Sequence, residues 1–312
     1  MKLDPSNNIN LFGYSKTFLY LINLYNKDLL PNKIIFSGNK GIGKSTFAYH
    51  LLNYIFSINE DNKYNCNENM ISKKNYSYNL VLKNIHPNFF LITSNEDNKN
   101  IQVSKIREMI SFTNKSSFNN ECKIILIDNI ECMTASSVNS LLKLIEEPNP
   151  NIYFFLIHNS KEKILDTLKS RCIKFNLFLN ENYKTKVVDK LLNNDFLATL
   201  NSDFNNIYST PGDLILLHNF FFDNEINPDV SIDIFLKLVI DKSLYKKSSY
   251  IKANLSYFIE LYFNKKINYL SSKANIYNLY KYFLSKIHDC DTYNLDHESI
   301  LLEFNGKFLN EQ

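Results

Sequence analysis

The 312-residue chain is 45% hydrophobic and carries a formal net charge of +3. A chain of this length can bury a substantial core and form two or three domains. The small net charge does not indicate a protein whose whole surface binds nucleic acid, or a polybasic membrane anchor. Local basic patches remain compatible with it.

The five cysteines are scattered, odd in number and never spaced as C-x-x-C. They are Cys66, Cys122, Cys132, Cys172 and Cys290. This pattern argues against a disulfide framework and against a zinc site, and it favours a reducing cytoplasm. No run approaches 18 apolar residues, so we expect neither export nor membrane insertion.

The first half of the chain alternates short apolar runs with amphipathic patterns, which predicts a parallel sheet flanked by helices. Strands are expected at 33–38, 88–94, 123–128, 151–159 and 172–175. Helices are expected at 44–56, from residue 103, and from residue 138 to a stop at Pro148, with Thr134 or Ser136 as the cap. The polar stretch 57–80 lacks periodicity, and we expect a surface excursion there.

The second half has helical periodicity and no strand-like runs. Breaks at Pro211-Gly212 and Asn227-Pro228 favour a small helical unit followed by a larger helical bundle. The predicted domains are therefore residues 1–177, 178–224 and 225–312.

The segment "GNKGIGKST" fits the phosphate-loop pattern G-x-x-x-x-G-K-[ST] directly after a predicted strand and at the start of a predicted helix. Glycines let backbone N–H groups and the helix N-terminus face a phosphate chain. Lys44 is expected to reach the β- and γ-phosphates, and Ser45 to hold Mg²⁺. A chance glycine turn is the alternative, and the strand–loop–helix context disfavours it. The nucleotide-binding residues predicted here are Gly38, Gly41, Gly43, Lys44, Ser45 and Thr46.

Asp128 follows the apolar strand 123–128, at the sheet edge where open α/β proteins place their ligands. We expect its carboxylate to serve the magnesium ion of the nucleotide together with Ser45. The alternative is an ordinary aspartate in a turn.

Three stretches are more specific than a general nucleotide-binding motif: "VNSLLKLIEEP" (138–148), "LIHNS" (156–160) and "LKSRCIKF" (168–175). With "HPNFFLI" and "IQVSKIREMI" ahead of them, they resemble the bacterial clamp-loader subunits of DNA polymerase III, most closely the delta prime type. The resemblance covers about residues 10–176. Beyond residue 176 the resemblance is limited to a pattern of helices and the segment "YSTPGDL".

The resemblance implies an AAA+ ATPase module that binds ATP and Mg²⁺, a helical lid and a helical collar. It implies a place in a five-membered ring with motor and delta subunits, which opens the sliding clamp and closes it on primed DNA as part of the polymerase holoenzyme, a nucleotidyltransferase complex. The resemblance implies that the chain acts on the DNA and the sliding clamp through the complex. No membrane partner is implied.

Only two of the 35 basic residues are arginine, and one of them stands in Ser-Arg-Cys. The resemblance implies that Arg171 projects as a catalytic finger into the nucleotide site of a neighbouring subunit. The planar guanidinium group of arginine, with its five N–H donors, suits that role better than the ammonium group of lysine does. The alternative for Arg171 is a surface salt bridge. For Arg107, packing or an intersubunit ion pair is favoured over chemistry.

The chain departs from the hydrolytic members of the family. They carry Asp-Glu where this chain has Asp128-Asn129, and an amide cannot act as a general base. Glu131 could substitute, but we favour a helix-start or surface residue, because leaving the strand moves it away from the γ-phosphate.

Two further positions bear on hydrolysis, and one further departure concerns zinc. Asp213 follows Pro-Gly, where the family often carries an arginine, and an aspartate there would repel phosphate. Asn159 aligns with the family's polar sensor of the γ-phosphate, although a strand-end cap is an equal alternative. The family's four-cysteine zinc module is expected to be missing, because Cys66 is the one cysteine in the corresponding stretch.

These departures predict a subunit that binds ATP with weak or no hydrolysis of its own. One alternative is a tau/gamma-type motor ATPase of the same complex. Another is a P-loop AAA+ ATPase outside clamp loading.

Overall fold

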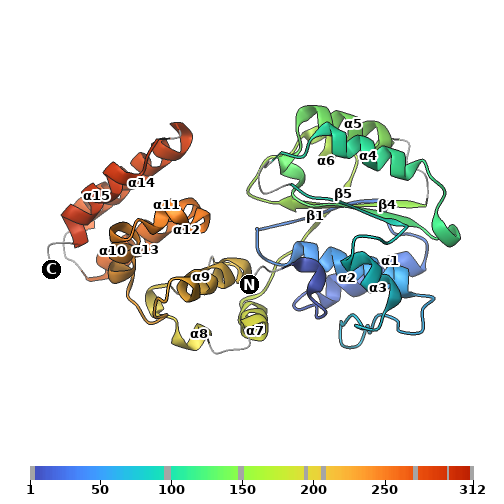
Figure 1. Ribbon diagram of the computed structural model, residues 1–312, viewed down its shortest axis with the longest axis horizontal. Helices are drawn as coiled ribbons and strands as arrows, with labels where there is room; N and C mark the ends of the chain where they lie inside the picture. Colours follow the sequence, from blue (N-terminus) through green and yellow to red (C-terminus); the bar gives the residue numbers. More distant parts are fainter. Residues whose placement is uncertain are drawn as a thin grey trace. The chain divides into compact units, whose positions relative to one another are not determined.

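The computed structural model describes residues 4–94, 100–146, 151–192, 196–204, 209–269, 273–293 and 295–309. The chain divides into two compact units (Figure 1). Unit 1 consists of Met1–Val187 with Thr210–Gly212, and unit 2 consists of Val188–Ser209 with Asp213–Gln312. The domain boundaries at 177 and 224 stay predictions.

Unit 1 contains a five-stranded parallel sheet in the order β2-β3-β4-β1-β5. The strands are β1 (Lys33–Gly38), β2 (Phe89–Ile92), β3 (Lys123–Ile127), β4 (Ile152–Asn159) and β5 (Ile173–Asn176). Each corresponds to one of the apolar runs in the sequence. The predicted α/β class, a parallel sheet with flanking helices followed by a helical region, is confirmed.

Helices cover both faces of this sheet (Figure 1). On one face lie α1 (Ser15–Asn26), α2 (Lys44–Ser57) and α3 (Tyr76–Leu82), and on the other lie α4 (Val103–Thr113), α5 (Ala135–Glu146) and α6 (Asp166–Lys169). Alternate strand residues feed the two cores: Ile34 and Phe36 pack on the first, whereas Ile35 packs on the second. Thr134 caps α5, its Oγ1 accepting the Ser137 N–H at 3.2 Å. The expected stop at Pro148 lies outside the described residues.

The polar stretch 57–80 is more ordered than its composition predicts. The Glu60 carboxylate accepts from Asn75 Nδ2 at 2.6 Å and from the backbone N–H groups of Tyr76 and Ser77 at 2.9 Å. The Asn75 side chain is fully buried, and its Oδ1 accepts the Tyr78 N–H at 2.6 Å. Because these contacts join distant residues, the surface excursion expected from local polarity becomes the anchored start of α3.

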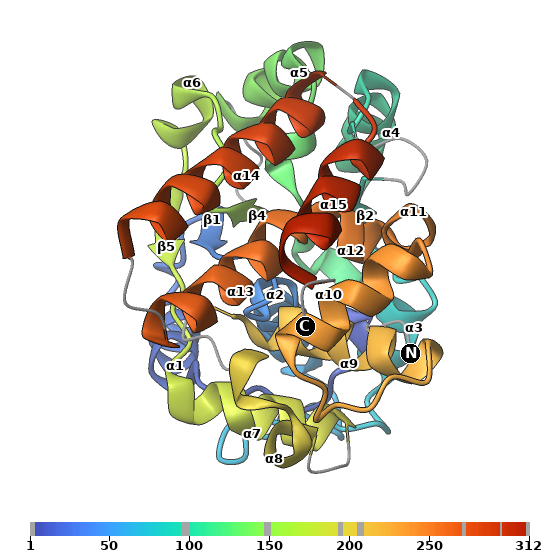
Figure 2. The same cartoon turned by 90° about the vertical axis from the view of Figure 1, so that its left-hand side faces the viewer.

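Unit 2 is helical. Its helices are α8 (Phe196–Thr199), α9 (Pro211–Asp223), α10 (Ile232–Asp241), α11 (Leu244–Lys247), α12 (Ser249–Ala253), α13 (Leu255–Tyr269), α14 (Lys273–Tyr293) and α15 (Glu298–Phe304), followed by a π-helical turn at Asn305–Leu309. The first two residues of α9 are assigned to unit 1. Helix α7 (Glu181–Leu192) carries the chain across the boundary between the units. Helices α14 and α15 pack together, with α13 beside α14 (Figure 2).

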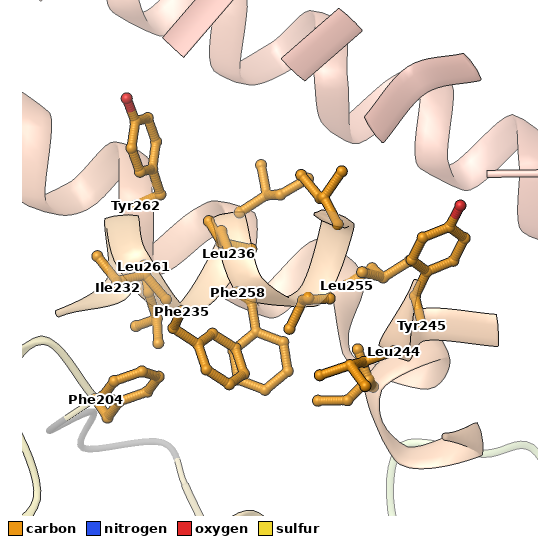
Figure 3. Packing of buried hydrophobic residues seen from close by; sticks show 14 of the residues in the cluster. Phe204, Ile232, Phe235, Leu236, Leu244, Tyr245, Leu255, Phe258, Leu261 and Tyr262 are labelled. Atoms are coloured by element: carbon orange, nitrogen blue, oxygen red, sulfur yellow. The ribbon is translucent and has the colours of Figure 1, made fainter. Parts of the chain in front are cut away.

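The core of unit 2 is built around aromatic rings. Phe235 packs against Phe204 and Phe258, with ring centroids 5.3 and 5.0 Å away (Figure 3). Beside this core, the Lys265 ammonium lies 2.8 Å from Asp203 Oδ2 and 2.5 Å from Asp233 Oδ2, which ties α13 to α10. The predicted break at Asn227-Pro228 falls between α9 and α10, but Pro211 begins α9 rather than interrupting it. A proline in the first turn lacks only an N–H that would have no helical partner.

Candidate functional site

The loop between β1 and α2 is shaped by two glycines in left-handed conformations. Gly41 has φ +82° and Gly43, the N-cap of α2, has φ +89°. Both values are strained for a residue with a Cβ. The turn directs the N-terminus of α2 to the carboxyl end of the sheet, where its N–H groups can bind an anion. Thr46, the third residue of α2, is partly exposed there.

Lys44 begins α2 and is buried. Its Nζ donates to the Asn39 carbonyl at 2.7 Å, and the Ser160 hydroxyl donates to Asn39 Oδ1 at 3.0 Å. Burial lowers the Lys44 pKa to about 8, and the Asp128 and Glu131 carboxylates partly oppose that shift. A bound phosphate would add a further negative partner for this ammonium beside those two acids.

Ser45 and Asp128 meet directly. The Ser45 hydroxyl donates to Asp128 Oδ2 at 3.0 Å, and the backbone N–H of Asn129 donates to Asp128 Oδ1 at 3.0 Å. Burial raises the pKa of Asp128, although these two hydrogen bonds and Lys44 favour its ionised form. A hydroxyl and a carboxylate beside an anion-binding helix terminus are hard oxygen ligands that fit Mg²⁺ held with a nucleotide.

The sheet register brings Asn159 to the same edge, because it pairs with Gly38 at the ends of β4 and β1. The structure thus brings the loop glycines, Lys44, Ser45, Asp128 and the backbone of Asn159 to one edge of the sheet. The Asn159 side chain makes the contact of a strand-end cap, its Oδ1 accepting the Lys161 N–H at 3.3 Å. Whether these residues bind a nucleotide stays a prediction.

Glu131 starts a short helix, as the sequence favours, but it also belongs to this cluster, contrary to the expectation that it moves away from the site. It lies in the short 3-10 helix Ile130–Cys132, and its Oε2 accepts the backbone N–H of Asn159 at 3.2 Å. Leaving the strand therefore does not carry Glu131 away from the site. The chain reverses at Asn129 and turns the carboxylate back, and no pattern in the sequence signals that turn.

Asn129 itself adopts the left-handed conformation, with φ 56° and ψ 57°. Asparagine tolerates this region better than most residues because its short polar side chain can hydrogen-bond locally. The amide at this position has a backbone reason as well as the chemical one inferred from the sequence.

The loop is closed by residues far along the chain that belong to the same unit. The Gly212 N–H donates to the Gly41 carbonyl at 3.0 Å. A Cβ on Gly41 would lie 2.4 Å from Thr210 Oγ1, and a Cβ on Gly212 would lie 2.7 Å from Gly41 Cα. Asp213, the next residue, is assigned to the other unit.

Arg171 is not part of this cluster. Its Nε and Nη2 lie 2.9 and 2.8 Å from Glu146 Oε1, and its Nη1 donates to the Thr167 carbonyl at 3.0 Å and to Ser170 Oγ at 3.4 Å. The side chain is 37% exposed. Among the described residues its partners are thus on α5 and α6, and none belongs to the phosphate loop. Arg107 is exposed on α4.

Two histidines near the sheet have structural partners. His158 Nδ1 lies 2.9 Å from Ser37 Oγ and its Nε2 lies 3.0 Å from the Glu162 carbonyl, while the His86 ring stacks on Phe56 at 4.1 Å. Burial lowers the pKa of both rings. Neither histidine takes part in the contacts among Lys44, Ser45 and Asp128.

No group of three or more His, Cys, Asp or Glu side chains in the described ranges is arranged to hold a metal ion. None of the described helices combines the length and apolar character needed to cross a bilayer.

A family model described as "DNA polymerase III, delta subunit" matches residues 13–180. The delta' subunit of DNA polymerase III from Buchnera aphidicola (subsp. Baizongia pistaciae) is 33% identical over 153 residues, which are 47% of this chain and 44% of the relative. The Bacillus subtilis delta' subunit is 32% identical over 152 residues, 49% of this chain and 44% of the relative. These matches span less than half the length of either relative.

The gamma/tau subunit of DNA polymerase III from Mycoplasma genitalium is 30% identical over 174 residues, which are 56% of this chain and 28% of the relative. Among solved structures, a gamma subunit-related protein of DNA polymerase III from Thermotoga maritima aligns over 92% of this chain and 97% of its own. The TM-score of that alignment is 0.46, with 14% identity.

Proposed function

The chain belongs to the family described as DNA polymerase III, delta subunit, and from this premise we propose that it is a delta prime-type subunit of the clamp loader. It binds ATP with little or no hydrolysis and supports loading of the sliding clamp on primed DNA. Its partners are motor and delta subunits in a five-membered ring, and its location is the cytoplasm.

The observation that carries nucleotide binding is the 3.0 Å contact between Ser45 and Asp128 beside the buried Lys44. The N-terminus of α2 binds the phosphates through its N–H groups, and Lys44 exchanges the Asn39 carbonyl for a phosphate oxygen. Ser45 and Asp128 would hold Mg²⁺, which supplies positive charge to the phosphates when bound.

Weak hydrolysis is supported by the amide at 129. No carboxylate directly follows Asp128, and the carboxylate of Glu131 is engaged by the Asn159 N–H. General-base assistance contributes about 10² to 10⁴ in rate, so its loss leaves a site that retains ATP.

Arg171 acts on a neighbouring subunit rather than on this chain's own nucleotide. Its guanidinium is partly exposed at the end of α6 and makes no described contact with the phosphate loop. In trans it would neutralise charge on the transferring phosphoryl group of a motor subunit.

Nucleotide binding is tested with Lys44→Ala. Hydrogen bonds to charged groups are worth about 1.5–3 kcal/mol, so the dissociation constant for Mg-ATP should rise about tenfold to a hundredfold. Lys83→Ala, which removes an exposed lysine at the C-cap of α3, is the control and should leave the affinity nearly unchanged. Equal affinities of wild type and Lys44→Ala would refute the site.

The trans role is tested with Arg171→Ala in the reconstituted complex, scored by DNA-stimulated ATP turnover. We expect a loss of about 10³-fold, because a finger of this kind contributes about 10³ to 10⁵. Lys83→Ala, at an exposed position at the C-cap of α3, should retain wild-type turnover. Full turnover without the Arg171 guanidinium would remove the assignment.

The match to a gamma/tau subunit favours one second candidate, a motor ATPase of the same complex. The two functions differ in the turnover of the isolated chain. Brisk hydrolysis by the purified protein that is lost in Asp128→Asn would favour the motor.

A further inference from the structure

Glu146 contacts two nitrogens of the Arg171 guanidinium group rather than one. One carboxylate oxygen, Oε1, lies within 2.9 Å of both Nε and Nη2 of Arg171. The remaining nitrogen, Nη1, is held by the Thr167 carbonyl and Ser170 Oγ at the end of α6. All three guanidinium nitrogens are thus held, which fixes the plane of the group.

Glu146 lies at the end of the described part of α5. The neighbouring Ile145 carbonyl is already bound by Lys33 Nζ at 3.1 Å. Among the described residues, the hydrogen-bond partners of the Glu146 carboxylate are Nε and Nη2 of Arg171.

The two sides of the guanidinium are held by different chemistry. A charged carboxylate holds the Nε side, whereas neutral oxygens hold Nη1. A phosphate oxygen makes a stronger, charge-assisted bond than a neutral carbonyl or hydroxyl does. An arriving phosphate can therefore take Nη1 from Thr167 and Ser170 while Glu146 keeps the Nε side.

We propose that Glu146 is a positioning residue for Arg171, holding its guanidinium oriented before a neighbouring nucleotide site closes on it. This inference rests on the proposed role of Arg171 in trans. Orienting the side chain in advance removes ordering that would otherwise accompany the reaction in the neighbouring site.

The orientation can be measured in the isolated chain, because Arg171 and Arg107 are its only arginines. In a ¹⁵N spectrum their two Nε–H groups can be assigned with a single Arg107→Lys variant. We expect slower solvent exchange for Arg171 than for Arg107, and acceleration in Glu146→Ala to the Arg107 rate. Glu146→Gln, which keeps an acceptor oxygen, should retain part of the protection. Fast exchange of Arg171 in the wild type would overturn the proposal.

The functional consequence is measured as ATP turnover of the reconstituted complex. Exposed ion pairs are worth up to about 1 kcal/mol and preorganisation adds to this, so Glu146→Ala should lower turnover about threefold to tenfold. Glu146→Gln should lose less. Glu108→Ala, which removes the partner of Lys105 from an ion pair of 3.0 Å on α4, is the matched control and should not change turnover.

The double variant with Arg171→Ala separates the possible outcomes. If Glu146 acts through Arg171, Glu146→Ala has no further effect once the arginine is gone. The same loss in both backgrounds, or turnover that is unchanged or raised in Glu146→Ala alone, would overturn the positioning role. An Arg171→Ala complex with full turnover would instead refute the proposed function itself.

Discussion

Residue 129 has two physical reasons to be an asparagine. Its left-handed backbone favours a short polar side chain. Under the proposed function, its amide stands where a hydrolytic subunit would carry an acid. The two reasons act on different quantities, since the first concerns the free energy of folding and the second the rate of ATP hydrolysis. A single substitution can therefore separate them.

We expect Asn129→Glu to raise ATP turnover of the isolated chain by about tenfold or more, because it restores a carboxylate next to Asp128. The same change should lower the free energy of unfolding by about 1 kcal/mol, since glutamate is less tolerant of a positive φ. Steady-state hydrolysis and urea unfolding measure the two effects. Asn129→Gly is the control: it relaxes the backbone without adding an acid and should leave turnover low. Turnover that stays low in Asn129→Glu would contradict a missing base as the cause.

The phosphate-loop residues were placed by motif because a fixed spacing between a strand and a helix allows few backbone paths. Lys44 and Ser45 sit at the start of α2, and Asp128 follows a run that is apolar on both faces. Glu131 could not be placed in this way. Its contact with the Asn159 N–H depends on one left-handed residue, and local patterns do not encode that turn.

At the scale of elements, the phosphate loop offers a matched pair of glycines. Both have positive φ, but a Cβ on Gly41 would lie 2.4 Å from Thr210 Oγ1, whereas a Cβ on Gly43 has no neighbour within 4 Å. Comparing the two positions separates the conformational role of glycine from the close approach of the chain before α9.

Gly41→Ala should lower the free energy of unfolding more than Gly43→Ala does. Each carries about 1–2 kcal/mol of backbone strain, and the clash at Gly41 adds about 1–3 kcal/mol. Denaturant unfolding measures the difference. Equal destabilisation would mean that the Thr210–Gly212 segment moves away from the loop at little energetic cost.

His50 joins α2 to two distant segments and predicts a pH dependence. It is fully buried, with Nε2 2.9 Å from the Asn8 carbonyl and Nδ1 2.8 Å from Tyr64 Oη, and burial lowers its pKa to about 4. The unfolded chain takes up a proton near pH 6.5, whereas the folded chain does so only near pH 4. Stability is therefore complete above pH 6.5 and falls as the pH is lowered towards 4.

The loss attributable to His50 should reach about 3 kcal/mol at pH 4, to which His86 adds through its own lowered pKa. Urea unfolding between pH 7 and 4.5 measures it. The pH dependence should be shallower in His50→Gln, whereas His288→Gln, at an exposed position on α14, should follow the wild type. Parallel curves for His50→Gln and wild type would contradict the assignment.

The strands were the most predictable elements, because a buried parallel strand is a short apolar run whose neighbours are polar or turn-forming. Helix α1 was not predicted, although Phe18, Leu21 and Ile22 recur at helical spacing and are buried. Helix α3 could not have been found from periodicity. Its start is fixed by Glu60, fifteen residues before Asn75.

At the scale of the whole molecule, the two units have separate hydrophobic cores. Phe235→Ala should lower the free energy of unfolding of unit 2 by about 3–5 kcal/mol, because it opens a cavity between Phe204 and Phe258. Mg-ATP affinity should be unchanged, since the predicted phosphate-binding residues lie in unit 1. Phe222→Ala, at a side chain 77% exposed on α9, is the control and should have little effect. A loss of ATP affinity in Phe235→Ala would show that the units do not fold independently.

The three hydrogen bonds of Glu60 have a consequence for how this protein can vary. They join the two ends of the segment between α2 and α3. Lengthening a closed surface loop adds little entropy cost, since each doubling costs only about 0.6 kcal/mol. Insertions at its exposed positions, such as those near Asn67, should therefore be tolerated, and this makes the segment a suitable place for a spectroscopic label or an affinity tag.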